Sequence, residues 1–186
     1  PSEKVPEELQ RFLCWYNRTA QTEGKEYMPG VVRAGIAHLW FEMIHPFDDG
    51  NGRVGRAIAD HALSQSLGYP TTACLSTAIE SDKKAYYEQL ENACSGDLDI
   101  NRWLCYFADT AINAQDIARQ EVDFVLSKTR FYDTFGDQIN DRQAKMVAKV
   151  FSEGRKGFEG SINTKKYEVI TKCPNRTASR DLTDMQ

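Results

Sequence analysis

Residues 29–67 read PGVVRAGIAHLWFEMIHPFDDGNGRVGRAIADHALSQSL. Apolar side chains recur at helical spacing on both sides of a polar, glycine-bearing stretch in the middle. This spacing predicts two helices, 29–44 and 54–67, which each bury one face and are joined by a specialised loop. Gly68, a typical residue at a helix end, follows the second of them. The apolar positions are Val32, Ile36, Leu39, Trp40 and Met43 in the first helix and Ile58, Ala62 and Leu63 in the second.

The same spacing continues over the rest of the chain and predicts an all-α protein. Further helices are expected over 6–17, over 82–94 with Ser81 as the N-cap, and over 99–132. No segment of alternating polarity and no Asn-Gly hairpin competes with this interpretation. The long helix is expected to turn Trp103, Phe107, Ile112, Ile117, Val122 and Leu126 inward.

The charge changes sign along the chain. The 186 residues carry a formal net charge of −4, but 1–136 hold 13 Lys and Arg against 20 Asp and Glu, whereas 137–186 hold 10 against 7. This change predicts two domains, 1–136 and 137–186. The first is too acidic to attract nucleic acid by its overall field, so anion binding there needs a local group of donors.

Composition also limits the class of protein. No apolar run approaches the roughly 18 residues of a membrane span, and the N-terminus lacks the apolar segment of a signal peptide. We therefore expect a soluble, cytoplasmic protein with no membrane partner. The five cysteines are scattered without metal-ligand spacing, so we expect reduced, mostly core-filling thiols at Cys14, Cys74, Cys94, Cys105 and Cys173.

The loop after residue 44 has the composition of an anion site. Gly50 and Gly52 flank Asn51 and let successive backbone N–H groups turn toward a common point, which suits a phosphate. The helix that follows adds the positive end of its dipole. Arg53 and Arg56, three positions apart on its first turn, can clamp a polyphosphate. As plain surface charges, two cations at this end of a helix would be mildly unfavourable.

Two more residues of the loop suggest chemistry. Asp49 offers a hard oxygen ligand to an Mg²⁺ that is otherwise held by water and phosphate. His45 precedes Pro46, which favours an extended conformation and turns the ring toward the loop, where an imidazole can act as a general base. A base, a metal ligand and a charged cradle together favour phosphoryl or nucleotidyl transfer.

The run HPFDDGNGRVGR at 45–56 matches the Fic motif HPFx(D/E)GNGRxxR at every specified position, and residues 5–117 resemble the Fic-domain protein adenylyltransferases. The resemblance implies a compact helical bundle. It also implies transfer of AMP from Mg-ATP to a Ser, Thr or Tyr hydroxyl of a protein, which could be the chain itself, with release of pyrophosphate. Gly52 stands where relatives that act as kinases have lysine, which implies AMP transfer rather than phosphate transfer.

The resemblance also implies roles for single residues. His45 would take the hydroxyl proton, Asp49 would bind Mg²⁺, and Phe47 would pack inward and anchor the loop. The glycines and Asn51 would seat the α- and β-phosphates, and the two arginines the β- and γ-phosphates. Cys94 departs from relatives that place a nucleotide-holding asparagine near this position. The implied nucleotide-binding set is Phe47, Asp49, Gly50, Asn51, Gly52, Arg53, Val54, Gly55, Arg56, Tyr86 and Tyr87.

Several residues also have structural interpretations. Asp48 is expected to cap a helix, and His38 and His61 are expected to be satisfied structural histidines. Tyr86 and Tyr87 border the nucleoside pocket in relatives, but adjacent helical residues point in different directions, so at least one of them is expected in the core.

The basic tail predicts a helix-turn-helix. Asn140 and Gln143 form a capping-box pattern, and helices are expected over 164–171 and 176–185 with a turn between them. This segment resembles the winged-helix tails of many bacterial Fic proteins, with any wing lying beyond residue 186. DNA binding through 164–186 and protein docking both remain open.

Two functions thus follow from the sequence. One is an enzyme that transfers AMP to a protein hydroxyl. The other is a DNA-binding or scaffold regulator whose Fic site senses ATP or is idle. The oligomeric state is open, with a homodimer as one candidate.

Overall fold

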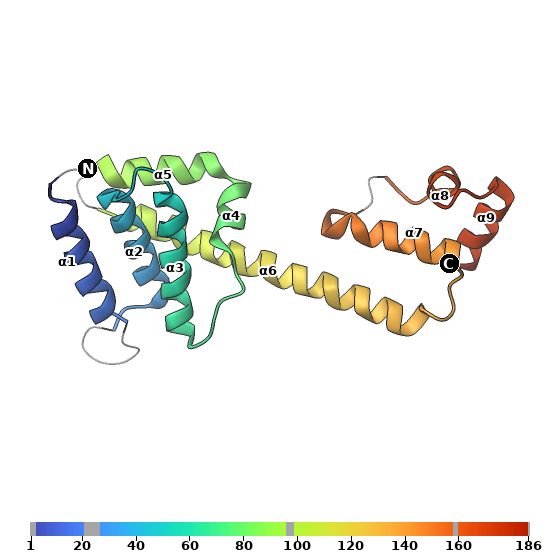
Figure 1. Ribbon diagram of the computed structural model, residues 1–186, viewed down its shortest axis with the longest axis horizontal. Helices are drawn as coiled ribbons and strands as arrows, with labels where there is room; N and C mark the ends of the chain where they lie inside the picture. Colours follow the sequence, from blue (N-terminus) through green and yellow to red (C-terminus); the bar gives the residue numbers. More distant parts are fainter. Residues whose placement is uncertain (1–2, 21–26, 96–98, 158–159, 186) are drawn as a thin grey trace. The chain divides into compact units, whose positions relative to one another are not determined.

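A computed structural model describes residues 3–20, 27–95, 99–157 and 160–185 (Figure 1). Across these ranges the chain is helical and contains no strand, which confirms the all-α prediction. It divides into two compact units, Pro1–Ala118 and Arg119–Gln186. The helices are α1 (Val5–Arg18), α2 (Gly30–Ile44), α3 (Asn51–Leu67), α4 (Leu75–Ser81), α5 (Lys83–Ser95), α6 (Asn101–Phe135), α7 (Asp141–Ser152), the 3₁₀ turn η1 (Gly154–Lys156), α8 (Thr164–Thr171) and α9 (Asn175–Asp184).

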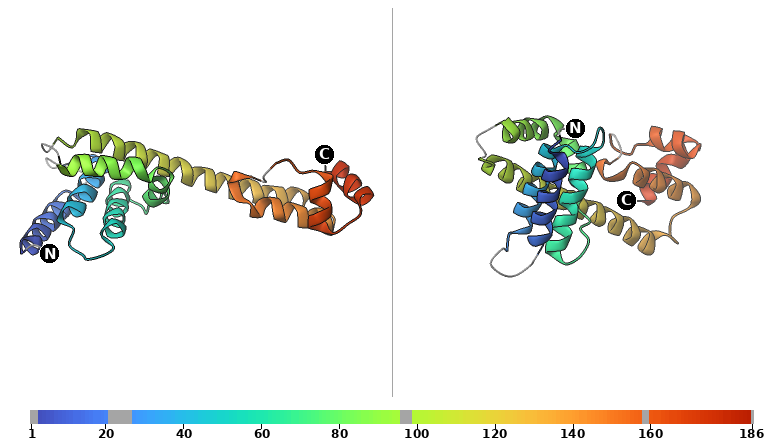
Figure 2. Two further views of the ribbon diagram at one scale, coloured as in Figure 1. Left: turned by 90° about the horizontal axis from the view of Figure 1, so that it is seen from above. Right: turned by 60° about the vertical axis from the view of Figure 1, so that its left-hand side comes forward.

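Helix α2 is the centre of the first unit. It packs against α1, α3 and α5, and Figure 2 shows it between α1 and α3. The expectation that it buries a single face is wrong, because its small residues let neighbouring helices approach from several sides. Its buried residues are Arg33, Ala34, Gly35, Ala37, His38, Leu39 and Phe41.

A buried arginine ties α2 to its neighbours. Arg33, which is 3% exposed, donates to the Tyr16 carbonyl at 2.7 Å, to Thr19 Oγ1 at 3.1 Å and to Gln65 Oε1 at 3.0 Å. Its guanidinium carbon also lies 4.3 Å from the centroid of the Tyr16 ring. These bonds satisfy the buried charge and fix α1, α2 and α3 relative to one another, which sets the frame for the loop at residues 45–50.

The helices differ from the sequence prediction in several details. Helix α3 begins at Asn51 rather than at residue 54, and α4 was not expected. Ser81 ends α4 rather than capping α5, and the Asp82 side chain accepts from the Ala85 amide instead. In α6 the buried residues are Trp103, Phe107, Thr110, Ala111 and Ala114, whereas Ile112, Val122 and Leu126 are exposed.

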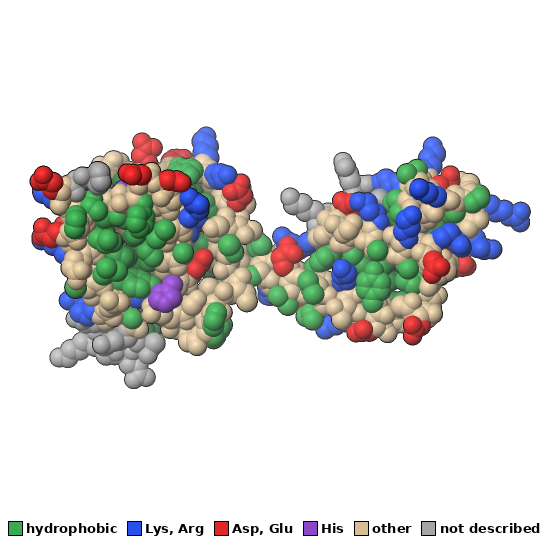
Figure 3. Space-filling model, viewed as in Figure 1, with side chains coloured by type: hydrophobic (Ala, Val, Ile, Leu, Met, Phe, Trp, Pro, Cys, Tyr) green, Lys and Arg blue, Asp and Glu red, His purple; other side chains and the backbone are tan. Residues whose placement is uncertain are grey.

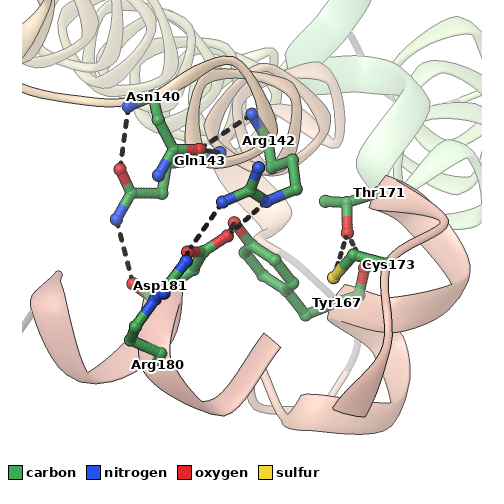
Figure 4. A network of polar contacts seen from close by, with 8 residues as sticks. All are labelled: Asn140, Arg142, Gln143, Tyr167, Thr171, Cys173, Arg180 and Asp181. Carbon is green, nitrogen blue, oxygen red and sulfur yellow. Dashed lines mark hydrogen bonds and ion pairs between the residues drawn. The ribbon is translucent and has the colours of Figure 1, made fainter. Parts of the chain in front are cut away.

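The second unit is built around α7, α8 and α9. Met146, Tyr167 and Ala178 form its buried core. Asp181, 1% exposed, accepts from Arg142 at 2.6 and 3.0 Å and from the Tyr167 hydroxyl at 3.1 Å (Figure 4). This network joins one residue from each helix and fixes α9 beside α7 and α8.

The two units divide within α6, whereas the change in charge placed the boundary after residue 136. The reason is aromatic packing: the rings of Phe124, Phe131 and Tyr132 in the second half of α6 lie 5.7–6.0 Å from that of Phe151. The distribution of charge along the sequence contains no information about these aromatic contacts, so it could not predict that the second half of α6 belongs to the second unit.

The cysteines differ from the expectation of core-filling thiols. All five are free, and four of them are exposed, because they lie on outward helix faces or at a helix start; only Cys173 is half-buried. There it accepts a hydrogen bond from Thr171 Oγ1 at 3.1 Å.

Candidate active site

Helix α2 ends at Ile44, and His45 is its C-cap. The His45 amide still donates to the Phe41 carbonyl at 3.1 Å, but its backbone is left-handed with φ 49° and ψ 57°. The extended conformation expected from Pro46 is therefore wrong, because the α2 C-cap position requires a left-handed residue and the proline then prevents the helix from continuing. The side chain is exposed at the start of the loop, as a base that meets a substrate must be.

Asn51 fixes the shape of the loop. Its side chain is 3% exposed, accepts from the Phe47 amide at 3.0 Å and donates to the Phe47 carbonyl. Both the oxygen and the nitrogen of the side-chain amide are thus engaged with one residue four positions earlier. Asn51 therefore positions the loop.

Phe47 is less buried than expected. Its side chain is 48% exposed, and its ring centroid lies 6.2 Å from that of Phe41. It packs on the edge of the core, and the Asn51 side chain holds its backbone.

The start of α3 has the geometry of an anion site. Gly50 is its N-cap with φ 89°, a conformation that glycine adopts without strain, and the Val54 amide donates to the Gly50 carbonyl at 3.0 Å. The earlier amides of a helix's first turn have no partner within the helix and point out from its end. They are the donors that a phosphate requires.

Both arginines of the motif reach this end of α3. Arg53 Nη2 lies 3.0 Å from Asp49 Oδ2, and the two side chains are 75% and 92% exposed. Such an exposed pair contributes little to stability, so both groups remain available to ligands. Arg56 is half-buried, and its Nε donates to Ser76 Oγ at 2.9 Å. Ser76, from the unexpected α4, is therefore a site residue that sequence reasoning missed.

A buried polar cluster lies behind the first turn of α3. A Cβ at Gly55 would stand 2.6 Å from Glu42 Oε1 and 3.0 Å from His38 Nδ1, and one at Gly52 would stand 3.8 Å from Glu42 Oε1 and 3.2 Å from Arg56 Nη1. Glu42 Oε1 and His38 Nδ1 are inaccessible and have no hydrogen-bond partner. Gly55 is thus needed for close packing rather than for contact with a nucleotide.

Burial is the largest influence on the pKa values of His38 and Glu42. It lowers the pKa of His38 to about 4 and raises the pKa of Glu42, while the charges of His45 and Arg56 lower the latter. His38 is fully buried and stacks on Trp103, as expected of a structural histidine. His61 is exposed and bonded to the Tyr16 hydroxyl at 2.7 Å. Sequence reasoning missed Glu42, although a charged residue in an otherwise apolar helix was a usable signal.

The two tyrosines of α5 differ in burial. Tyr86 is 2% exposed and shares a hydrogen bond of 2.9 Å with His38 Nε2, so it belongs to the core. Tyr87 is 62% exposed and free to border a ligand. Val54 is also partly exposed and lines a shallow apolar groove with Ala57 and Ile58, on the outer side of α3.

Comparison with known proteins agrees with this geometry. Residues 1–63 match the Fic/DOC family. The matched range contains the whole loop and the first turn of α3, and the resemblance found in the sequence is thereby confirmed. The second unit lies outside the match.

Three curated relatives are animal proteins. The chain is 30% identical over 94 residues to the protein adenylyltransferase Fic of Nematostella vectensis, a match that covers 50% of this chain and 21% of that protein. It is 34% identical over 96 residues to the protein adenylyltransferase fic-1 of Caenorhabditis briggsae (52% and 17%). It is 32% identical over 109 residues to the protein adenylyltransferase Fic of Drosophila ananassae (59% and 20%). The chain spans about a fifth of the length of these relatives.

Two properties of the described residues concern membranes and metal ions. None of their helices is long and apolar enough to cross a bilayer. They also contain no group of three or more His, Cys, Asp or Glu side chains that could hold a metal ion by themselves. A metal at Asp49 would therefore need ligands from a bound molecule and from water.

Proposed function

We propose that the chain transfers AMP from Mg-ATP to a hydroxyl group of a protein and releases pyrophosphate. The observation that carries this proposal is the segment 45–56, which consists of the loop and the start of α3. It contains an exposed imidazole at the C-cap of α2, the N-terminus of α3 and two arginines near the beginning of that helix. The relatives named protein adenylyltransferase support the same reaction class.

Each part of the loop has a chemical role in this reaction. His45 accepts the proton of the attacking hydroxyl, whose oxygen forms a bond to the α-phosphorus. The bond between this phosphorus and the bridging oxygen breaks, and pyrophosphate leaves with the electron pair. The α3 amides, Arg53 and Arg56 hold the triphosphate and stabilise the charge that develops on it. Asn51 and Ser76 position the loop and Arg56.

Magnesium fits the residues that are present. Asp49 is 92% exposed and only one of its oxygens is paired with Arg53, so the carboxylate can take a cation. One carboxylate with phosphate and water oxygens is a usual ligand set for Mg²⁺. When bound, the ion would neutralise phosphate charge, and Asp49 would then exchange Arg53 for the metal.

The position of the radiolabel in ATP tests the reaction. With native protein and Mg²⁺, label on the α-phosphate is expected to enter protein, whereas label on the γ-phosphate is not. The reverse pattern indicates phosphate transfer and contradicts the proposal. Gly52→Lys, which places an ammonium group at the phosphate seat, is expected to reduce transfer of the α-label.

The cytoplasm remains the proposed compartment, because four exposed free thiols suit a reducing environment. A homodimer is the proposed assembly, and sedimentation equilibrium tests it. A monomer at all concentrations would contradict it.

We also propose that the second unit binds duplex DNA through α9. Helices α8 and α9 are joined by three residues, Lys172, Cys173 and Pro174, which is the connection length usual in a helix-turn-helix. Figure 3 shows Lys and Arg side chains gathered over the α8–α9 end of this unit. The one carboxylate buried there, Asp181, is bonded to Arg142 and adds little negative charge to the surface. Exposed cations on this part are Lys165, Lys172, Arg176 and Arg180.

Salt dependence of binding tests this second candidate. Affinity for duplex DNA is expected to fall steeply as salt rises, and Arg176→Ala and Arg180→Ala are each expected to weaken binding and reduce the salt slope. Lys128→Ala, which removes an exposed cation from α6, is the matched control. Equal loss in the control, or no binding at low salt, would leave protein docking as the role of this unit.

A further inference from the structure

The carboxyl group of Glu42 lies directly behind the site at which the phosphates would sit. Its Oε1 is 3.8 Å from the point where a Cβ of Gly52 would stand, and Gly52 belongs to the first turn of α3. Arg56 Nη1 is 3.2 Å from the same point. The carboxylate and the arginine therefore face the same end of the helix from two sides.

This carboxyl group lacks the partners that a buried charge normally has. Glu42 Oε1 is inaccessible and makes no hydrogen bond, and both this oxygen and His38 Nδ1 lie within 3.0 Å of the point where a Cβ of Gly55 would stand. His38 uses its Nε2 for the Tyr86 hydroxyl. A buried, unpaired carboxylate oxygen is costly, and a proton removes the cost by making the group neutral.

The charged and titratable groups around Glu42 belong to α2 and its C-cap and to two of the helices packed on α2, namely α3 and α5. His38 and His45 belong to α2 and its end, Arg56 to α3, and Tyr86 and Cys94 to α5. In the absence of a ligand, burial opposes the ionised carboxylate, while the charge of Arg56 favours it. A polyphosphate at the α3 N-terminus would engage Arg56 and add negative charge on the same side, so the balance would move toward the neutral acid.

We propose that nucleotide binding at the motif is coupled to the uptake of a proton by Glu42. This inference rests on the proposed function, because it takes the polyphosphate as the anion. The proton comes from solvent and binds one carboxyl oxygen, and the neutral group then faces the phosphates without repulsion. Its O–H can donate toward the neutral ring of His38.

The sign of the pH effect follows from linkage. The bound anion raises the pKa of Glu42 further, so between the values for the free and the bound protein the complex holds one more proton. Within that window nucleotide affinity rises as pH falls, by at most about tenfold per pH unit for one proton. Below the window the acid is neutral in both states, and above it the carboxylate is ionised in both.

Calorimetric titration with Mg²⁺ and α,β-methylene-ATP, which cannot release pyrophosphate, tests the coupling. Titrations in buffers of different ionisation enthalpy give the number of protons taken up. Native protein is expected to take up more protons than Glu42→Gln, and the variant is expected to bind several-fold more tightly at mildly alkaline pH. Protons exchanged by the nucleotide and by groups other than Glu42 are released or taken up in both proteins, so they cancel in the comparison.

Two further variants make the result decisive. Glu88→Gln removes an exposed carboxylate of α5 and is expected to keep the native proton uptake. Glu42→Met removes the carboxyl group with an apolar side chain of similar length, and is used if the glutamine variant does not fold. Equal proton uptake in native protein and in a folded Glu42 variant overturns the coupling. Absence of nucleotide binding in native protein instead contradicts the proposed function itself.

Discussion

The Asn51 side chain maintains the shape of the loop at residues 45–50. Replacing Asn51 with alanine leaves the Phe47 amide and carbonyl without these partners in a partly buried place. Asn51→Ala is expected to lower the free energy of unfolding by about 1–3 kcal/mol and to weaken nucleotide binding. Thermal and denaturant unfolding measure the first effect. Asn92→Ala, on the exposed side of α5, is the control, and an equal loss in both variants would count against the anchoring role.

Gly55 makes room for the cluster behind α3. Alanine usually stabilises a helix relative to glycine, but here its Cβ would lie 2.6 Å from Glu42 Oε1 and 3.0 Å from His38 Nδ1. Gly55→Ala is therefore expected to destabilise the first unit by about 1–3 kcal/mol. The double variant with Glu42→Ala is expected to recover part of this loss. A stabilised single variant would show that the side chains move aside freely.

The main role expected of Arg56 is to bind nucleotide, rather than to stabilise the fold. Its bond to Ser76 Oγ is a single hydrogen bond that keeps the guanidinium at the α3 end. Loss of a charge-assisted contact with phosphate costs about 1.5–3 kcal/mol, so Arg56→Ala is expected to weaken ATP binding roughly ten- to a hundredfold. Ser76→Ala is expected to have a smaller effect in the same direction. Equilibrium dialysis with ATP measures both, and unchanged affinity in Arg56→Ala would contradict the assigned role.

Among the elements, those with local signals were predictable. Helix α8 has the predicted bounds, and the capping box of α7 forms as expected: Asn140 accepts from Gln143, and the Gln143 side chain accepts from the Asn140 amide. Helix α4 is too short for a periodic pattern. The burial of α2 on several sides, the left-handed His45 and the position of Glu42 depend on helices that are distant in the sequence, so no local pattern reports them.

The contribution of the N-terminal cap to the stability of α7 can be tested by mutation. Asn140→Ala removes the side-chain oxygen that accepts from the Arg142 and Gln143 amides but keeps the backbone amide that donates to the Gln143 side chain. It is expected to lower the stability of the second unit by about 1 kcal/mol. Asn140→Ser keeps an accepting oxygen and is expected to retain most of that stability. Hydrogen exchange of the α7 and α9 amides reports the difference. If serine and alanine behaved alike, the cap would not be what stabilises α7.

For the whole molecule, the division into two units predicts separable behaviour. Hydrogen bonds from Arg142 hold the pKa of Asp181 below its ordinary value, so its contribution to stability is present at neutral pH and is lost as pH falls through the lowered pKa. Asp181→Asn is expected to loosen α9 and to remove this acid-sensitive component. Exchange of α9 amides followed against pH measures it.

The same variant is expected to leave ATP binding in the first unit unchanged, because the network of Asp181 lies entirely within the second unit. A parallel loss of ATP binding would contradict the separation of the two units.

The central claim is tested most directly by the intact mass of proteins incubated with Mg-ATP, either the chain alone or a lysate with added chain. Native protein is expected to produce the mass increment of one AMP on a protein. His45→Ala is expected to bind ATP as the native chain does and to produce no such increment. An equal increment with His45→Ala would contradict the account, as would the absence of any adduct with a native chain that binds Mg-ATP.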